Sequence, residues 1–187
     1  MAKIITAAEA ADLIRDGMTL GVSGFGAFAS PDCVMEAMSR KFKEQNTPRD
    51  LTIVSGVAPG DFVEDGCGLS KIKDEGIIKT LIASHLRMSP AIGRACSENK
   101  IAAFSMPLGV YGQLMNAIGG KRPGIITHVG LNTYADPRQD GCKMNELAKA
   151  DGREMVELIH VSGKDYLFYK AFHIDAVSYT HLTLPTI

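Results

Sequence analysis

The sequence predicts an α/β fold: a doubly wound, mostly parallel sheet with helices on both faces. Three observations support this class. Strand-like and helical segments alternate over residues 1–120. Glycine-bearing loops directly follow the first two strand-like segments. The chain has 187 residues and is 45% hydrophobic, which is enough for a sizeable core. Because parallel strands need crossover connections, the alternation predicts right-handed βαβ units.

The first predicted helix covers residues 6–14. Thr6 is placed to cap its N-terminus, and Glu9 stands three residues later, where it completes a capping box. Small and apolar residues recur with the helical period, which predicts one buried face. Asp16 and Gly17 end the helix.

A strand over residues 19–23 follows and leads directly into Gly24-Phe25-Gly26. Ser30 and Pro31 then predict the N-cap and the first residue of a second helix, over residues 31–42. A strand, a glycine turn and a helix in this order place the turn at the carboxyl end of a parallel strand, where ligands bind. Glycine there lets backbone N–H groups approach a ligand closely.

The glycine spacing excludes the dinucleotide-binding fingerprint. Gly21, Gly24 and Gly26 form G-x-x-G-x-G, whereas that fingerprint is G-x-G-x-x-G. The second strand, Leu51–Ser55, does not end in the acidic residue that would hold a ribose, and the chain has no Walker A sequence. On the residues alone, a ligand-contacting loop and a structural tight turn both remain open.

Further elements continue the alternation. The pattern predicts strands over residues 51–54, 77–83 and 101–104, and helices over residues 89–99 and 107–118. A break follows at residues 119–124, after which helical periodicity fades. The later part predicts two strands around a turn: residues 155–160, 162–164 and 166–169.

Composition narrows the class of protein. The net charge of −1 gives no electrostatic bias towards nucleic acid or an anionic membrane, and the apolar runs are too short to span a bilayer. No signal peptide precedes the first helix. The four cysteines are widely separated and form no C-x-x-C, so we expect reduced thiols in a cytoplasmic protein and no metal site.

Several stretches, taken in order, resemble one family. They are Ile14–Gly17 with Gly21–Gly26 and Pro31, Glu98–Ile101, Arg122–Leu131, Thr133–Arg138 and Tyr166–Tyr169. Together they resemble the amino-terminal part of family I coenzyme A transferases, and within that family the propionate/acetate (short-chain acyl) group. The resemblance covers roughly residues 3–176.

The resemblance implies a Rossmann-like transferase domain over residues 1–176 that lacks the second half of the family's chain. Such enzymes move CoA between a short-chain acyl-CoA and a carboxylate such as acetate, through a glutamyl-CoA intermediate. Coenzyme A is then a substrate, and no cofactor is permanently bound. The nucleophilic glutamate would lie beyond residue 187, so no catalytic residue is expected in this chain. The complete protein is expected to be a homo-oligomer.

The expected substrate-binding residues follow successive strands. Because the carboxyl ends of parallel strands share one edge of a sheet, these residues should line one cleft. They are Gly24, Phe25, Gly26, Gly56, Gly60, Leu108 and Gly109. Two positions depart from the family: Leu108 stands where many members carry glutamine, and Ser84-His85-Leu86 replaces Gly-His-Trp. The first departure puts acyl specificity, or activity itself, in doubt.

Other polar residues are weaker candidates. Glu98 lies in a Ser-Glu-Asn triplet but should sit at a helix C-terminus, where a solvated carboxylate is expected. His85 and His128 are expected to be structural hydrogen-bonding groups rather than catalysts. The polar cluster of Asp136, Arg138 and Lys143 is either a solvated loop, a domain or subunit contact, or a contact to CoA phosphate through its cations.

Residues 177–187 do not continue the family's pattern, and we expect a non-native, badly packed tail there. Two other functions remain open: a ligand-binding or sugar-phosphate-isomerase-like domain of the same superfold, and a non-catalytic subunit. An isomerase would need paired Asp and Lys residues at strand ends.

Overall fold

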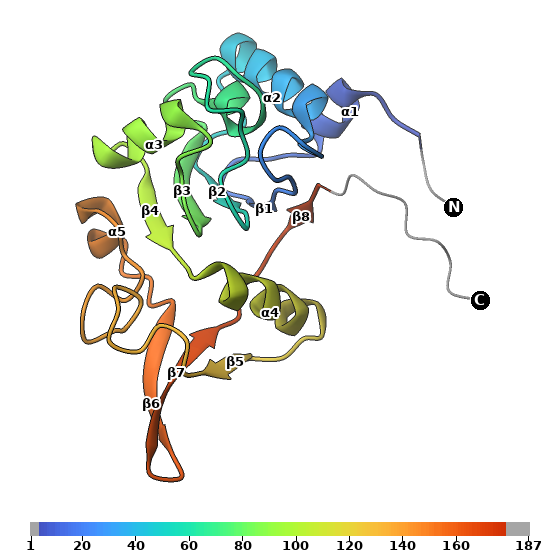
Figure 1. Cartoon of the computed structure of the whole chain (residues 1–187). Coiled ribbons are helices and arrows are strands. Elements are labelled where there is room, and N and C mark those ends of the chain that lie inside the picture. Colours follow the sequence, from blue (N-terminus) through green and yellow to red (C-terminus); the bar gives the residue numbers. More distant parts are fainter. Residues whose placement is uncertain (1–3, 179–187) are drawn as a thin grey trace.

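The computed structural model describes residues 4–178, and its centre is a five-stranded parallel sheet. The strand order is β4-β3-β2-β1-β8, with each neighbouring pair parallel (Figure 1). The strands are β1 (Thr19–Gly21), β2 (Leu51–Val54), β3 (Ile78–Ala83), β4 (Ala102–Ser105) and β8 (Ala176–Val177). The predicted parallel sheet is therefore confirmed.

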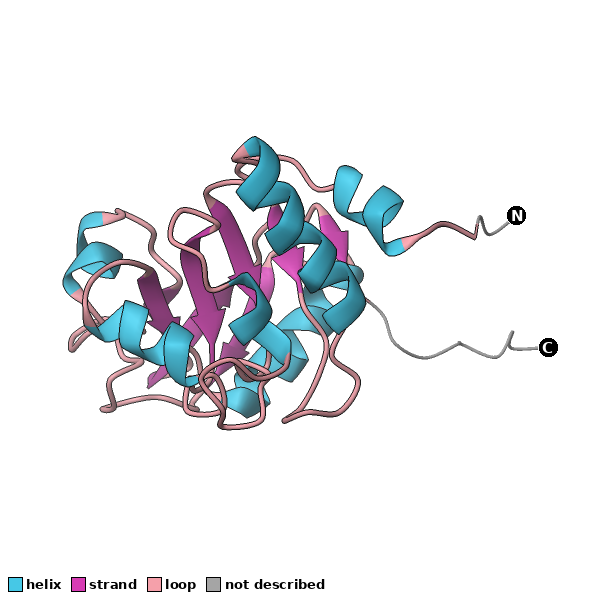
Figure 2. Ribbon diagram, turned by 90° about the horizontal axis from the view of Figure 1, so that it is seen from above, coloured by secondary structure: helices cyan, strands magenta, loops and turns pink. Residues whose placement is uncertain are grey.

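Helices cover both faces of this sheet (Figure 2). On one face lie α1 (Ala7–Asp12), α2 (Asp32–Gln45), the short 3-10 helix η1 (Gly68–Ile72) and α3 (Pro90–Ser97). On the other face lie α4 (Leu108–Gly119) and α5 (Glu146–Ala150). The four longer predicted helices are present, with ends shifted by up to three residues; α5 was not predicted because five residues carry little periodicity.

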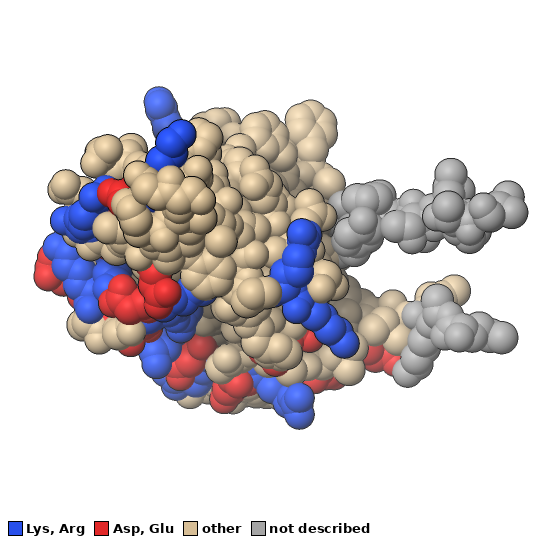
Figure 3. Space-filling model, turned by 90° about the horizontal axis from the view of Figure 1, so that it is seen from below, with Lys and Arg blue, Asp and Glu red and all other residues tan. Residues whose placement is uncertain are grey.

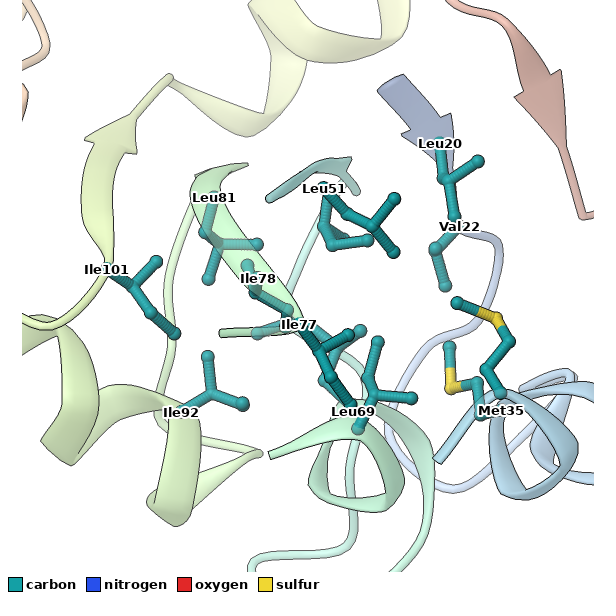
Figure 4. Close-up of a cluster of buried hydrophobic side chains, with 14 of the residues drawn as sticks. Leu20, Val22, Met35, Leu51, Leu69, Ile77, Ile78, Leu81, Ile92 and Ile101 are labelled. Atoms are coloured by element: carbon teal, nitrogen blue, oxygen red, sulfur yellow. The ribbon is translucent and has the colours of Figure 1, made fainter. Parts of the chain in front are cut away.

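Successive residues of β2, β3 and β4 contribute to two separate apolar cores. Leu81 of β3 packs with α2, η1 and α3, whereas Ile82 packs with α4. Figure 4 shows the first core, in which Leu51, Leu81 and Ile92 converge from two strands and a helix. Burial on both faces explains why all four residues of β2, Thr52 included, are buried.

A second sheet lies beyond α4 and has three antiparallel strands in the order β5-β7-β6. The strands are β5 (Gly124–Thr127), β6 (Val156–Val161) and β7 (Lys164–Lys170). Leu167 and Tyr169 of β7 are fully buried against the α4 side of the molecule. The predicted β6–β7 hairpin is confirmed, but its pairing with β5 was not foreseen because the two segments are far apart in sequence.

Helix starts differ in how well the sequence predicted them. The capping box of α1 is present: Glu9 N–H donates to Thr6 Oγ1 over 3.2 Å, and Thr6 N–H donates to Glu9 Oε2 over 2.8 Å. The predicted cap of α2 is wrong. Pro31, not Ser30, precedes the first helical residue, and neither makes a side-chain cap. Asp32 instead accepts a 2.9 Å hydrogen bond from Gly68 N–H, which ties α2 to η1.

Residues 177 and 178 are the part of the expected tail that the structure describes. Val177 pairs with Gly21 in β8, and Ser178 Oγ accepts a 2.9 Å hydrogen bond from Ser23 N–H. Val177 is thus part of the sheet, although its side chain is 63% exposed. The expected poor packing of the tail stays a prediction. The rest of the tail, residues 179–187 with Leu182 and Leu184, lies outside the described residues.

The surface carries both signs of charge, as expected from 20 basic and 21 acidic residues. On the face shown in Figure 3, acidic and basic side chains are interspersed along one side and the centre is largely uncharged. Within residues 4–178, no helix is long and apolar enough to cross a membrane.

Candidate functional site

The predicted site residues lie at the carboxyl edge of the parallel sheet. Since β1 to β4 all run in the same direction, the loops that follow them emerge at one edge. The first two loops contact each other: Gly60 N–H donates to Gly26 O over 3.1 Å. A β-carbon at Gly24 would lie 3.1 Å from Pro59 Cβ. Gly24, Gly26 and Gly60 are therefore brought together.

Gly56 lies against the start of α4. A β-carbon there would be 3.2 Å from the Tyr111 ring and 3.4 Å from Leu108 Cδ1. Gly109 is different, because a β-carbon at its position would meet no described atom within 4 Å. The printed contacts thus join Gly24, Gly26 and Gly60 in one group and Gly56 with Leu108 in another, and Gly109 faces open space.

Backbone conformation explains the glycines of the first loop. Gly24 has φ of 132° and Gly26 has φ of 60°, a region that residues with side chains rarely adopt. Among the described residues, the N–H groups of Gly24, Gly26 and Gly56 donate to no protein acceptor. Unpaired N–H groups at a strand end can stabilise a carbonyl oxygen or an oxyanion on a ligand.

Exposed apolar side chains surround these loops. Phe25 and Phe28 exchange two backbone hydrogen bonds, of 3.0 and 3.1 Å, and their side chains are 61% and 80% exposed. Phe62, in the loop after β2, is 59% exposed, and Leu108 is 50% exposed. Sequence reasoning missed Phe28 and Phe62. The sequence did contain a signal for them. Both are aromatic residues in loops that contain glycine and proline, where no helix or strand pattern assigns them to a buried face.

The rejected catalytic candidate, Glu98, lies elsewhere. It caps the C-terminus of α3, just before β4 begins, so it is at the amino edge of the sheet. Its carboxylate pairs with Lys100 over 3.2 Å. His85 follows β3 and is exposed at the carboxyl edge, whereas His128 follows β5 of the second sheet.

The polar loop cluster is organised around a buried carboxylate. Asp136 is 0% exposed and accepts hydrogen bonds from the backbone N–H groups of Asn132 and Arg138, at 2.9 and 3.0 Å. The Arg138 guanidinium adds two more, at 2.9 and 2.7 Å, and holds the pKa of Asp136 well below its usual range. Arg138 also pairs with Asp165 over 3.2 Å.

Lys143, the other cation of this loop, pairs with Glu154 over 2.6 Å. Because carboxylates neutralise both Lys143 and Arg138, the arrangement favours a structural role for the cluster over contact with a phosphate.

Two of the four cysteines, Cys96 and Cys142, are buried, whereas Cys33 at the start of α2 is exposed. Burial raises the pKa of the Cys96 and Cys142 thiols to about 12, so both stay protonated at neutral pH. All four cysteines are free thiols.

Comparison with known proteins identifies the family. Residues 4–182 match the coenzyme A transferase family. The chain belongs to that family. It is 42% identical to caffeate CoA-transferase from Acetobacterium woodii, over 94% of this chain and 32% of the relative. It therefore spans about a third of the length of such relatives.

Solved structures agree with this assignment to the CoA-transferase family. The apoenzyme of the acyl-CoA transferase YdiF from Escherichia coli O157:H7 superposes with a TM-score of 0.86 at 35% identity. The match covers 93% of this chain and 33% of that one. A thioester complex of YdiF with CoA superposes equally well, with a TM-score of 0.86 over 92% of this chain and 33% of that one.

Proposed function

We propose that this chain forms the amino-terminal part of an acyl-CoA:carboxylate CoA-transferase. Its substrates would be a short-chain acyl-CoA and a carboxylate such as acetate. One observation carries the proposal: more than nine-tenths of the chain matches a transferase at 42% identity. The glycine loops after β1 and β2 also emerge at the same edge of the sheet. Coenzyme A would act as a substrate, and the complete protein would be a cytoplasmic homo-oligomer.

The chemistry divides between this chain and a segment beyond residue 187. A glutamate carboxylate of that segment attacks the thioester carbonyl and expels the CoA thiolate, which forms an acyl-glutamyl anhydride. The thiolate then attacks the glutamyl carbonyl and releases the donor carboxylate, leaving glutamyl-CoA. The acceptor carboxylate reverses these steps. The unpaired N–H groups of Gly24, Gly26 and Gly56 would stabilise oxyanions, and Phe25 and Leu108 would contact apolar parts of the substrate.

The isomerase alternative is less well supported. It requires paired Asp and Lys residues at the strand ends. The described ends of β1 to β4 instead carry serines: Ser23, Ser55, Ser84 and Ser105.

An exchange assay tests the proposal. The 187-residue chain is mixed with propionyl-CoA and acetate, acetyl-CoA formation is followed, and borohydride trapping is used to detect a glutamyl-CoA adduct. We expect no turnover, because positioning and oxyanion donors without a nucleophile leave only residual catalysis. Extending the chain with the family's carboxy-terminal half should restore exchange. Turnover by the short chain that Glu98→Ala abolishes would overturn both the placing of the nucleophile beyond residue 187 and the rejection of Glu98.

A further inference from the structure

A serine at the carboxyl end of each of three successive strands donates its hydroxyl to a carbonyl just beyond the end of the preceding, neighbouring strand. Ser55 Oγ, after β2, donates to Val22 O over 2.9 Å. Ser84 Oγ, after β3, donates to Gly56 O. Ser105 Oγ, at the end of β4, donates to Ser84 O over 3.0 Å. We call these three serines the serine ladder.

The serine ladder is not required by the strand pairing itself. The backbone already pairs there, with Ser55 N–H donating to Ile82 O and Ser84 N–H to Gly56 O, both over 3.0 Å. Ser55 is 0% exposed and Ser105 is 8% exposed. An alanine at either position would avoid the burial of a hydroxyl group. A buried hydroxyl stabilises a structure only through the partners it finds, and here each hydroxyl donates to a carbonyl at the neighbouring strand end. Ser105 Oγ also lies 3.4 Å from Tyr134 Oη.

The peptide groups that the ladder holds lead into the glycine loops. Ser105 holds the carbonyl of the Ser84–His85 peptide, and His85 O in turn accepts a 3.0 Å hydrogen bond from Ala58 N–H. The loop that contains Ala58 continues to Gly60, whose N–H donates to Gly26 O. A chain of hydrogen bonds therefore runs from β4 across the sheet edge to the loop after β1.

We propose that Ser55, Ser84 and Ser105 are positioning residues that couple the carboxyl-end loops, so that the unpaired N–H groups of the glycine loops are presented together. The substrate atom that these N–H groups meet is a carbonyl or carboxylate oxygen, which rests on the proposed transferase function. The coupling between loops does not depend on that function and can be measured in the unliganded chain.

The coupling is tested by NMR on the 15N-labelled 187-residue chain with Ser105→Ala. We expect changed amide shifts at His85 and Ala58, and also at Gly26, which belongs to the loop after β1. Amide exchange should become faster at Ala58 and Gly60, whose N–H groups donate to His85 O and Gly26 O. The matched control is Ser70→Ala. Ser70 is 3% exposed and its hydroxyl lies 3.1 Å from Ser89 Oγ, so the control loses a buried serine contact outside the ladder. Its effects should leave Gly26 unchanged.

Ser84, which is only half-buried, provides the second variant and a functional readout. Ser84→Ala should weaken coenzyme A binding roughly three- to tenfold, the value of one hydrogen bond, and Ser84→Thr, which keeps the hydroxyl, should restore it. Shift changes confined to the direct neighbours of Ser105 would overturn the inference, as would equal effects of Ser84→Ala and Ser84→Thr. If the wild-type chain binds no coenzyme A, only the proposed function is contradicted. The NMR experiment on the unliganded chain tests the coupling between loops separately.

Discussion

Asp136 is the residue whose environment is most sharply defined. Its carboxylate is fully buried and accepts two backbone and two guanidinium hydrogen bonds. Burial alone would raise its pKa, but the Arg138 partner outweighs that effect and lowers it. The folded state is therefore stabilised by the ionised form of this side chain.

Asp136→Asn should lower the free energy of unfolding by roughly 2 to 3 kcal/mol at neutral pH, the size of hydrogen bonds to a charged group. The folded pKa lies below the unfolded value of about 3.9, so this stabilisation is present above that value and is lost as the pH falls below it. Urea unfolding across pH should show the two proteins converging in acid. Asp140→Asn, at an exposed carboxylate, is the control and should change little; a constant gap at all pH values would contradict the argument.

At the scale of elements, Asn145 joins three segments through one amide side chain. It caps α5, and all its bonds are to backbone groups. Its Oδ1 accepts from Ala148 N–H and Ala103 N–H, at 3.0 and 3.2 Å, and its Nδ2 donates to Cys96 O and Ile101 O, both at 2.7 Å. These contacts attach α5 to the end of α3 and to β4.

Asn145→Asp should therefore destabilise the fold even though aspartate is a good helix cap. The new carboxylate oxygen would face two carbonyl oxygens in place of the amide donor, and we expect a loss of roughly 3 kcal/mol in the free energy of unfolding. Asn116→Asp is the matched control, because Asn116 makes one exposed 3.3 Å bond to Gly112 O. Urea denaturation measures both. An Asn145→Asp protein as stable as the control would show that the two donor bonds contribute nothing.

At the scale of the whole molecule, two cores share one sheet. Strands β2, β3 and β4 each contribute to both cores, so neither core can open without the other. The chain offers a convenient probe, since it has no tryptophan and five tyrosines. Tyr111 and Tyr169 lie in or against the α4-side core, and none of the described tyrosines belongs to the other one.

Leu81→Ala, in the core opposite α4, should lower stability by about 2 to 5 kcal/mol. Although the cavity is remote from the tyrosines, the urea midpoints from tyrosine fluorescence and from far-UV circular dichroism should fall together, because the shared strands make unfolding cooperative. Leu13→Ala is the control, because Leu13 is 64% exposed and its loss should shift the midpoint little. Separated midpoints would indicate that the two cores unfold independently.

The sequence by itself determined the features that depend on neighbours along the chain. The α1 capping box needs only residues three apart, and the mainly apolar, β-branched segments that form β2 and β3 need only their own side chains. The order of strands and helices followed from these local signals, and with it the placing of the glycine loops at one sheet edge.

Only the tertiary structure decided the contacts between residues far apart in sequence. Asp32, not Ser30, makes the bond at the start of α2, because Gly68 is brought there by the fold. The β5–β7 pairing, the Arg138–Asp165 pair and the serine ladder likewise join residues 21 to 46 positions apart. Such bonds depend on strand register and loop path, which local propensity does not specify, because their free energy appears only when the chain has already packed.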